Sequence, residues 1–222
     1  MTLEICLDAP ASILAAERGG AHRIEVCSSL AEGGLTPNPG LIDFACRNFS
    51  GDVMIMLRPR GGDFIYSEAE MEVILGDLQA ARKAKVKGVV FGALTPTGDI
   101  NESQLAQVME AAGSMEVTFH RAFDVCRDLS SALEILIRHR VTRVLTSGGK
   151  PNVEAGSETL TKLVSQAAGR IKILAGGGLS PALIPSLAAK TGCKEFHLSA
   201  RTGRESIMQY RREDIPMGST QL

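Results

Sequence analysis

The sequence predicts an α/β fold, a (β/α)8 or TIM barrel, from three observations. Eight short apolar segments, each about as long as a strand, alternate with segments of helical periodicity. The apolar segments start roughly 20 to 36 residues apart, which is the length of one βα unit. Polar residues gather where these segments end, and TIM barrels carry their active sites there. An open nucleotide-binding sheet is disfavoured because no GxGxxG or Walker sequence is present.

The strands are expected at residues 3–8, 23–29, 53–60, 88–94, 116–124, 143–149, 171–178 and 195–201. Helical segments are expected between them, among them 10–21, 67–85, 101–113, 127–139, 157–169 and 180–192. Ser67 and Glu70 form a capping-box pattern at one helix start. The pattern gives eight strands but only seven clear helices, so we expect the eighth helix to be short or missing. We expect one barrel domain over 1–210 and a C-terminal tail over 211–222.

Composition excludes several classes of protein. Of the 222 residues, 44% are apolar and 22% charged, and the formal net charge is −1. Such a chain offers no electrostatic basis for binding nucleic acid or a membrane surface. No apolar stretch is long enough to span a bilayer, and the start of the chain is neither a signal nor a transit peptide. We therefore expect a cytosolic protein. Its 5 cysteines are odd in number and the compartment is reducing, so we expect no disulfide framework, and the absence of a CxxC pair removes the common zinc-site spacings.

Alternation along the strands indicates which side chains point into the barrel. In "LEICLD" and "RIEVC" the apolar residues share the face toward the helices, and the acidic and cysteine residues share the other. In "EVTFHRAFD" the inward face carries Thr118, His120 and Asp124. Barrel interiors normally fill with branched apolar residues, so charged residues there indicate a polar pocket.

One hypothesis is an acid–base pocket at the barrel mouth. Carboxylates beside imidazoles shift each other's pKa toward neutrality and can exchange protons with a substrate, or bind a hard divalent metal. The candidate catalytic residues are Glu4, Glu25, Arg58, His120, Asp124 and His197. The structural alternative is a buried ion-pair network that includes Arg23, Arg58 and Arg60.

A second hypothesis is an anion site after the later strands. The sequence "GGGLSP" places bare backbone N–H groups at a helix start, and barrels often bind phosphate after strands seven and eight. The candidate anion-binding residues are Arg60, Gly148, Gly149, Gly176, Gly177, Gly178, Ser199 and Arg201. A phosphate or a carboxylate would fit these donors. The structural alternative is that the glycines only permit tight turns.

Several motifs together also resemble a known family. "RPRGGDF", "TFHRAFD", "RVLTSGG" and "EFHLSARTGRES" occur in the order expected of the copper homeostasis protein family CutC, over nearly all of the chain to about Tyr210. The resemblance implies a TIM barrel, a cytosolic setting, a homodimer and a role in Cu(I) handling. It also implies that Cys6 and Cys27 are copper ligands, although this chain ends where the family usually continues through a further helix.

Two functions therefore stay open. Two thiolates on adjacent strands suit Cu(I), because soft sulfur selects that ion. A buried cysteine can equally be a small packing residue. The first function is a copper homeostasis protein that binds Cu(I) as its partner ion. The alternative is a TIM-barrel enzyme that uses the acid–base pocket on a small anionic substrate, with phosphorylated substrates included.

Overall fold

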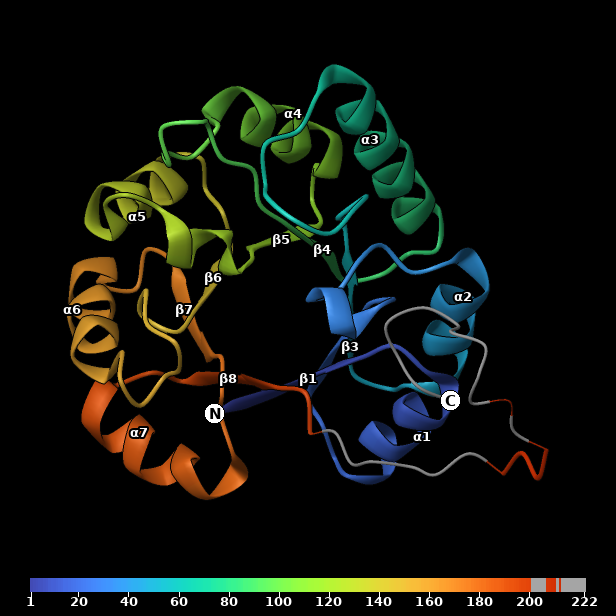
Figure 1. The fold of residues 1–222 in the computed structure, drawn as a ribbon. Helices are drawn as coiled ribbons and strands as arrows, with labels where there is room; N and C mark the ends of the chain where they lie inside the picture. Colours follow the sequence, from blue (N-terminus) through green and yellow to red (C-terminus); the bar gives the residue numbers. More distant parts are fainter. Residues whose placement is uncertain (201–206, 211, 213–222) are drawn as a thin grey trace.

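The computed structural model describes residues 1–200, 207–210 and 212, and it shows a closed barrel of eight parallel strands (Figure 1). Each strand pairs with its neighbours in sequence, and β1 pairs with β8 to close the ring. The strands are β1 (Thr2–Leu7), β2 (Arg23–Val26), β3 (Asp52–Met56), β4 (Gly88–Phe91), β5 (Glu116–Phe119), β6 (Arg143–Thr146), β7 (Lys172–Gly176) and β8 (Glu195–Leu198). The predicted (β/α)8 architecture is confirmed.

Seven α-helices surround the barrel in the described part of the chain. They are α1 (Pro10–Arg18), α2 (Pro39–Asn48), α3 (Glu68–Lys83), α4 (Glu102–Ala112), α5 (Leu129–Arg138), α6 (Ser157–Ala167) and α7 (Ile184–Thr191). No α-helix follows β8 within the described residues, as predicted. The proposed 211–222 tail lies outside them apart from Arg212, and the proposed domain boundary at 210 stays a prediction. No helix in the described part is long and apolar enough to cross a membrane.

Local sequence explains where the helices begin. Ser67 caps α3 in a full capping box with Glu70, as the sequence predicts. Asn38 caps α2 and is followed by Pro39, a favoured first helical residue. This helix is not among the predicted segments, although Asn38 and Pro39 form a helix-start signal.

The predicted strands are longer than the observed ones. The run 53–60 gives a strand of only five residues, and the run 116–124 becomes β5 followed by a 3-10 helix, η2 (Arg121–Val125). Polar residues at the ends of these runs thus belong to loops at the C-terminal edge of the barrel. Two further 3-10 helices, η1 (Leu30–Glu32) and η3 (Pro181–Leu183), lie at the same edge because they follow β2 and β7.

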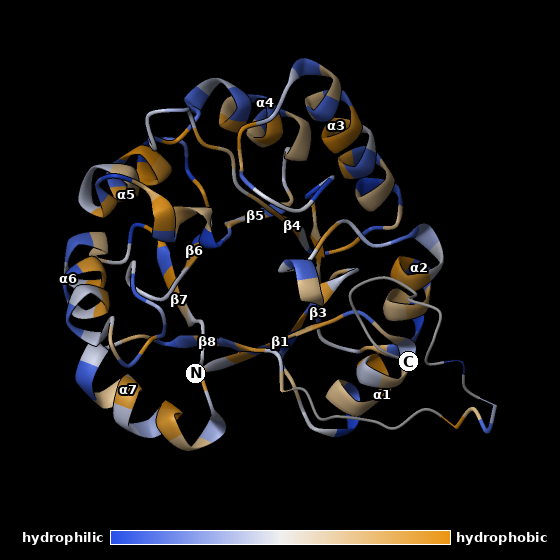
Figure 2. Cartoon of the chain, viewed as in Figure 1, coloured by the Kyte–Doolittle hydropathy of each residue, from blue (hydrophilic) through white to orange (hydrophobic). Residues whose placement is uncertain are grey.

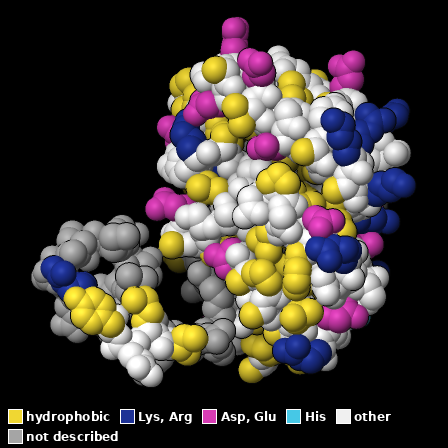
Figure 3. All heavy atoms as spheres, turned by 90° about the vertical axis from the view of Figure 1, so that its right-hand side faces the viewer, with side chains coloured by type: hydrophobic (Ala, Val, Ile, Leu, Met, Phe, Trp, Pro, Cys, Tyr) yellow, Lys and Arg dark blue, Asp and Glu magenta, His cyan; other side chains and the backbone are white. Residues whose placement is uncertain are grey.

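The main hydrophobic core lies between barrel and helices. The outward face of every strand contributes to it, for example Ile24, Ile55, Phe91 and Phe119, each with no exposed surface. Figure 2 shows the matching amphipathic pattern, with hydrophobic and hydrophilic residues alternating along the helices. On the face formed by α1 to α3, acidic and basic side chains are interspersed (Figure 3). The inside of the barrel is a separate region, and it is much more polar than this core.

Candidate functional site

A chain of ion pairs fills the lower part of the barrel interior, at the N-terminal ends of the strands. Nε of Arg23 binds Glu4, and its Nη2 lies 2.6 Å from Oε2 of Glu195. Arg143 also binds Glu195, at 3.2 Å, and ion-pairs with Glu116. Arg143 is 1% exposed, so its charge is neutralised entirely by these neighbours. These ion pairs therefore explain how the barrel interior accommodates two buried arginines.

Arg143 and Glu195 are not among the residues that the sequence analysis singles out. Both stand at the first position of a strand, at the edge opposite the expected active site. Alternation along β6 and β8 could have placed them inside, because Glu195 precedes the inward His197 by two residues. What the pattern lacks is any signal that two charges on non-adjacent strands would meet.

On the C-terminal side of this ion-pair chain, three predicted site residues come together. The ligand atoms of Cys6, Glu25 and His197 all lie within 4.8 Å of one another, and all three residues are buried. His197 Nδ1 lies 2.6 Å from Oε1 of Glu4, so Nε2 is the ring nitrogen left for the group. One oxygen of Glu25, Oε2, has no hydrogen-bond partner. The group thus combines a thiol, an imidazole nitrogen and a carboxylate, each with free coordinating capacity.

Burial and charge set the protonation of this group. Burial opposes the charged form of His197, but the charges of Cys6 and Glu25 and the bond to Glu4 outweigh it, and the His197 pKa lies well above 6.5. Burial likewise opposes ionisation of Glu4, yet His197 and Arg23 lower its pKa to about 2. Burial raises the pKa of Glu25. Glu4 is therefore the permanent carboxylate that orients the imidazole.

Cys27 lies next to this group without being part of it. Its Sγ is 3.4 Å from Oε1 of Glu25, and burial, followed by the Glu25 charge, raises its pKa well above 9.0. On its other side Cys27 packs in a small cluster with Met54, Met56 and Val90, all inside the barrel. A thiol and two thioethers therefore share one pocket beside Glu25.

Arg58 and His120 form a different set of contacts. The guanidinium of Arg58 donates to the backbone oxygens of Glu32, Gly34 and Gly62. His120 Nδ1 accepts the backbone N–H of Ala122, at 3.1 Å. Neither side chain contacts the Cys6 group by a hydrogen bond or an ion pair in the described part of the chain.

Asp124 lies in a third place, in η2 after β5, and its side chain reaches the start of the loop after β6. Its carboxylate accepts the hydroxyl of Thr146 at 2.5 Å and the backbone N–H groups of Ser147 and Gly149 at 3.0 Å. It also forms an ion pair with Arg121, at 2.7 Å. The six candidate catalytic residues are thus divided among three groups of contacts, because η2 turns the chain after His120 toward β6.

The candidate anion-binding residues are similarly distributed. Arg60 is part of a half-exposed surface cluster with Asp63 and Glu70. The N–H of Gly148 donates to Thr146 and that of Gly149 to Asp124. Gly176 ends β7 beside His197, and Ser199 directly follows β8 and is half-buried. Arg201 lies outside the described residues.

Gly177 and Gly178 leave room for neighbouring side chains. A Cβ at Gly177 would lie 3.1 Å from both the Arg121 guanidinium and the Ser147 Cβ, and one at Gly178 would lie 2.8 Å from Asn152. Both glycines have positive φ angles, which disfavour other residues. Arg121, whose direction strand alternation cannot settle, thus lies across the loop after β7.

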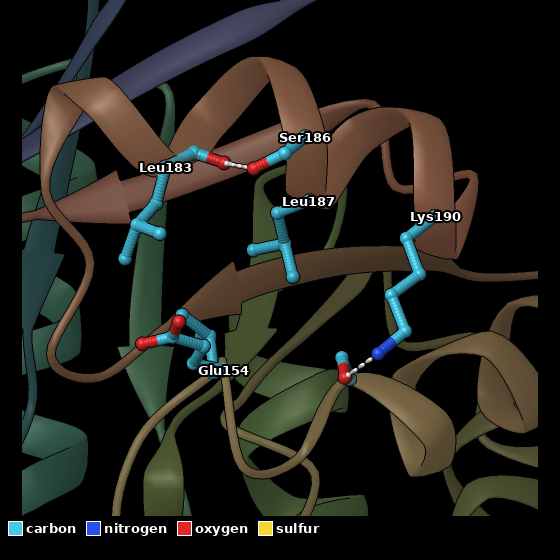
Figure 4. A pocket seen from close by; sticks show the side chains of 7 residues that line it. Glu154, Leu183, Ser186, Leu187 and Lys190 are labelled. Carbon is cyan, nitrogen blue, oxygen red and sulfur yellow. Dashed lines mark hydrogen bonds between the residues drawn. The ribbon is translucent and has the colours of Figure 1, made fainter.

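A shallow hollow of about 190 Å³ lies outside the barrel, between the loop after β6 and α7 (Figure 4). Glu154, Leu183, Leu187 and Lys190 line it, and the Lys190 amine donates to Ser157 at 2.7 Å. It contains none of the predicted site residues. The interior of the barrel is therefore the candidate functional site.

The chain is similar to named relatives along almost its whole length. It matches the profile of the CutC family over residues 1–202. A CutC family protein from Parabacteroides distasonis is 46% identical over 219 residues, which cover 98% of this chain and 90% of that protein. The copper homeostasis protein cutC homolog of Homo sapiens is 41% identical over 218 residues, covering 98% of this chain and 80% of that protein.

Solved structures agree. The CutC protein from Streptococcus agalactiae superimposes with a TM-score of 0.86 at 28% identity, covering 90% of this chain and 98% of that one. A deoxyribose-phosphate aldolase from Aeropyrum pernix gives a TM-score of 0.66 at 15% identity, over 89% and 85% of the two chains, which shows the shared barrel fold alone. With the profile match and relatives above 40% identity over nearly every residue, the chain belongs to the CutC family.

Proposed function

We propose that this protein is a cytosolic Cu(I)-binding protein of copper homeostasis, and that the ion binds inside the barrel. The observation that carries the proposal is the convergence of Cys6 and His197 within 4.8 Å, with the Cys27 sulfur 3.4 Å from Oε1 of Glu25. Thiolate and imidazole are ligands that suit copper, and thioethers favour its reduced state. Family membership supports the same function, since relatives carry copper homeostasis in their names.

The ligand chemistry favours Cys6 and His197 as two of the copper ligands. His197 has the arrangement of a typical metal-binding histidine, with one ring nitrogen held by a carboxylate. Because its pKa is raised well above 6.5, the other nitrogen must lose a proton when it binds the ion. Cys27 supplies the second thiolate, as the family resemblance implies. Because the pKa of Cys27 is raised well above 9.0, binding at this sulfur must release a proton.

Glu25 has a separate role in this proposal. A carboxylate is a hard ligand and a poor match for Cu(I). Its oxygen already lies 3.4 Å from the Cys27 thiol, so it is placed to accept the proton that Cys27 loses. Its raised pKa makes it a stronger proton acceptor than an ordinary carboxylate.

Two further parts of the proposal come from the family resemblance and from composition. We expect a homodimer in solution, and a reducing compartment agrees with the free thiols of all five cysteines. The alternative, an acid–base enzyme acting on a small anion, stays a prediction. Its six residues are divided among separate groups of contacts, so copper binding is the function that the geometry supports better.

The test is a Cu(I) titration without oxygen against a competing chelator. Cys6→Ala, Cys27→Ala and the double variant should each weaken binding, with the double variant losing it. Cys46→Ala is the matched control, because that thiol is exposed on α2 and far from the barrel interior. Circular dichroism would verify that each variant is folded. An unchanged Cu(I) affinity in the folded double variant would refute the proposal.

A further inference from the structure

Arg58 is a buried charge without an acidic partner. The residue is 6% exposed, and its guanidinium donates to the backbone oxygens of Glu32, Gly34 and Gly62. Among the described residues no carboxylate lies within ion-pair distance of it. Buried charges are normally paired, because removing an isolated ion from water is expensive. Arg58 therefore leaves a positive charge that backbone dipoles offset only in part.

One N–H of Arg58 is also unused. Nη1 and Nη2 are engaged with carbonyl oxygens, but Nε is buried and has no hydrogen-bond partner. An unsatisfied buried donor is unusual in a native protein and needs an explanation. The charge and the free N–H lie in the same guanidinium group, so one ligand could satisfy both.

His120 provides a second unused donor nearby. Its residue is 4% exposed, and Nε2 is buried without a partner. Because the backbone N–H of Ala122 donates to Nδ1, the proton of the neutral ring lies on Nε2. Burial and the charge of Arg58 lower the pKa of His120 to about 3, so the ring stays neutral and Nε2 remains a donor. It cannot serve as a general base with that nitrogen.

Phe64 connects the two donors. Its ring centroid lies 4.9 Å from the guanidinium carbon of Arg58 and 4.9 Å from the ring centroid of His120. Phe64 itself is half-buried, so it separates both groups from solvent. On the same loop, the buried hydroxyl of Tyr66 lies beside the Arg58 guanidinium, and burial outweighs the effect of that charge and raises the pKa of Tyr66 to about 12. The two unused N–H donors, of Arg58 and His120, thus lie beside one loop at the C-terminal edge of the barrel.

We infer that Arg58 and His120 form a binding site for a small monocarboxylate, covered by Phe64. One carboxylate has two oxygens for the two free N–H groups, and its single negative charge balances the single charge of Arg58. Phosphate carries more charge and needs more donors than the site offers. A buried water molecule could accept the same hydrogen bonds but would leave the charge of Arg58 uncompensated. This site goes beyond copper binding and shares no residue with the copper ligands.

The two unused groups can be observed directly by NMR. In 15N-labelled protein the Arg58 Nε–H and His120 Nε2–H signals are assigned by their loss in Arg58→Lys and His120→Phe. Acetate should shift both signals saturably. Acetamide, which has the same shape and no charge, and chloride at equal ionic strength should shift neither. Inorganic phosphate should bind on the order of tenfold more weakly than acetate or not at all.

Variants and controls complete the test. Folded Arg58→Lys and His120→Phe proteins should bind acetate about ten- to a hundredfold more weakly, as expected for a lost charge-assisted hydrogen bond. Arg47→Lys is the matched control, since that side chain is exposed on α2 and pairs only with Asp43. Acetate binding should persist in the Cys6→Ala/Cys27→Ala protein, which separates this site from copper binding.

The wild-type spectrum decides the inference even if a variant does not fold. If acetate moves neither signal, the donors hold water and the inference is wrong. If phosphate saturates both signals at lower concentration than acetate, the ligand class is wrong.

Discussion

The Nδ1 atom of His197 lies 2.6 Å from Oε1 of Glu4, while the other oxygen of Glu4 binds Arg23. The carboxylate is fully buried and thus links the ion-pair chain of the lower barrel to the candidate copper site. Arg23 holds the Glu4 carboxylate in place, and this carboxylate fixes the orientation of the His197 imidazole. The candidate copper site is therefore supported by charges that lie deeper in the barrel than any of its proposed ligands.

We expect Glu4→Gln to weaken Cu(I) binding by about ten- to a hundredfold, although Glu4 is not a ligand in this proposal. A neutral amide would orient His197 less firmly and make its free nitrogen a weaker donor to the metal. The measurement is the same chelator competition. Glu17→Gln is the control, since Glu17 binds only Ser50 near the surface. An affinity equal to that of the wild type would show that Glu4 serves the ion-pair chain alone.

Alternation along β1 and β2 was enough to predict that Glu4, Cys6, Glu25 and Cys27 share the inside of the barrel. It could not predict which of them touch, because contact depends on how far each strand is shifted along its neighbour. The strand register places Glu4 level with Arg23 on β2 and with His197 on β8. Glu4 therefore contacts these two residues, and it does not reach the loops at the mouth of the barrel.

The loops were the least predictable part of the site. The motif "HRAFD" reads as a continued strand, but the chain turns into η2 after His120 and carries Asp124 toward Thr146. Arg58 was expected to meet a substrate through its charge, yet most of its donors hold backbone oxygens. Such contacts involve peptide groups, which every residue has, so side-chain chemistry alone gives no signal for them.

A second prediction concerns Met56, which packs with Cys27 inside the barrel. We expect Met56→Leu to lower the Cu(I) affinity several-fold while leaving the fold intact. Leucine conserves the volume and removes only the thioether sulfur, a soft ligand for Cu(I). Met71→Leu is the matched control, because Met71 is equally buried but lies in the outer core. Equal affinities in the two variants would exclude the thioether from the site.

A third prediction follows from the pKa of His120, which burial and Arg58 lower from 6.5 to about 3. Below about pH 6.5 the unfolded chain takes up a proton at this residue and the folded chain does not. The free energy of unfolding should therefore fall as the pH decreases through this window, by up to about 1.4 kcal/mol per pH unit from His120 alone. Above pH 6.5 this contribution is constant.

Urea unfolding of wild type and His120→Phe at several pH values would test this. Carboxylates titrate alike in both proteins, so the difference between their free energies of unfolding isolates His120. That difference should shrink as the pH falls from about 6.5 toward 3. Parallel pH profiles would contradict the lowered pKa.

The last prediction uses two glycines as a matched pair. A Cβ at Gly92, just after β4, would lie 2.5 Å from Nδ1 and Cε1 of His120, too close for any real contact. Gly92→Ala must therefore displace the buried imidazole and break its bond with Ala122, and we expect a loss of about 1–3 kcal/mol in the free energy of unfolding. A Cβ at Gly76, on the solvent side of α3, meets nothing within 4 Å, so Gly76→Ala should stabilise the protein by up to about 1 kcal/mol. Urea unfolding measures both, and the His120 Nε2–H signal should move in Gly92→Ala alone. If Gly92→Ala is as stable as the wild type with that signal unmoved, the ring is not held against β4 as the structure shows.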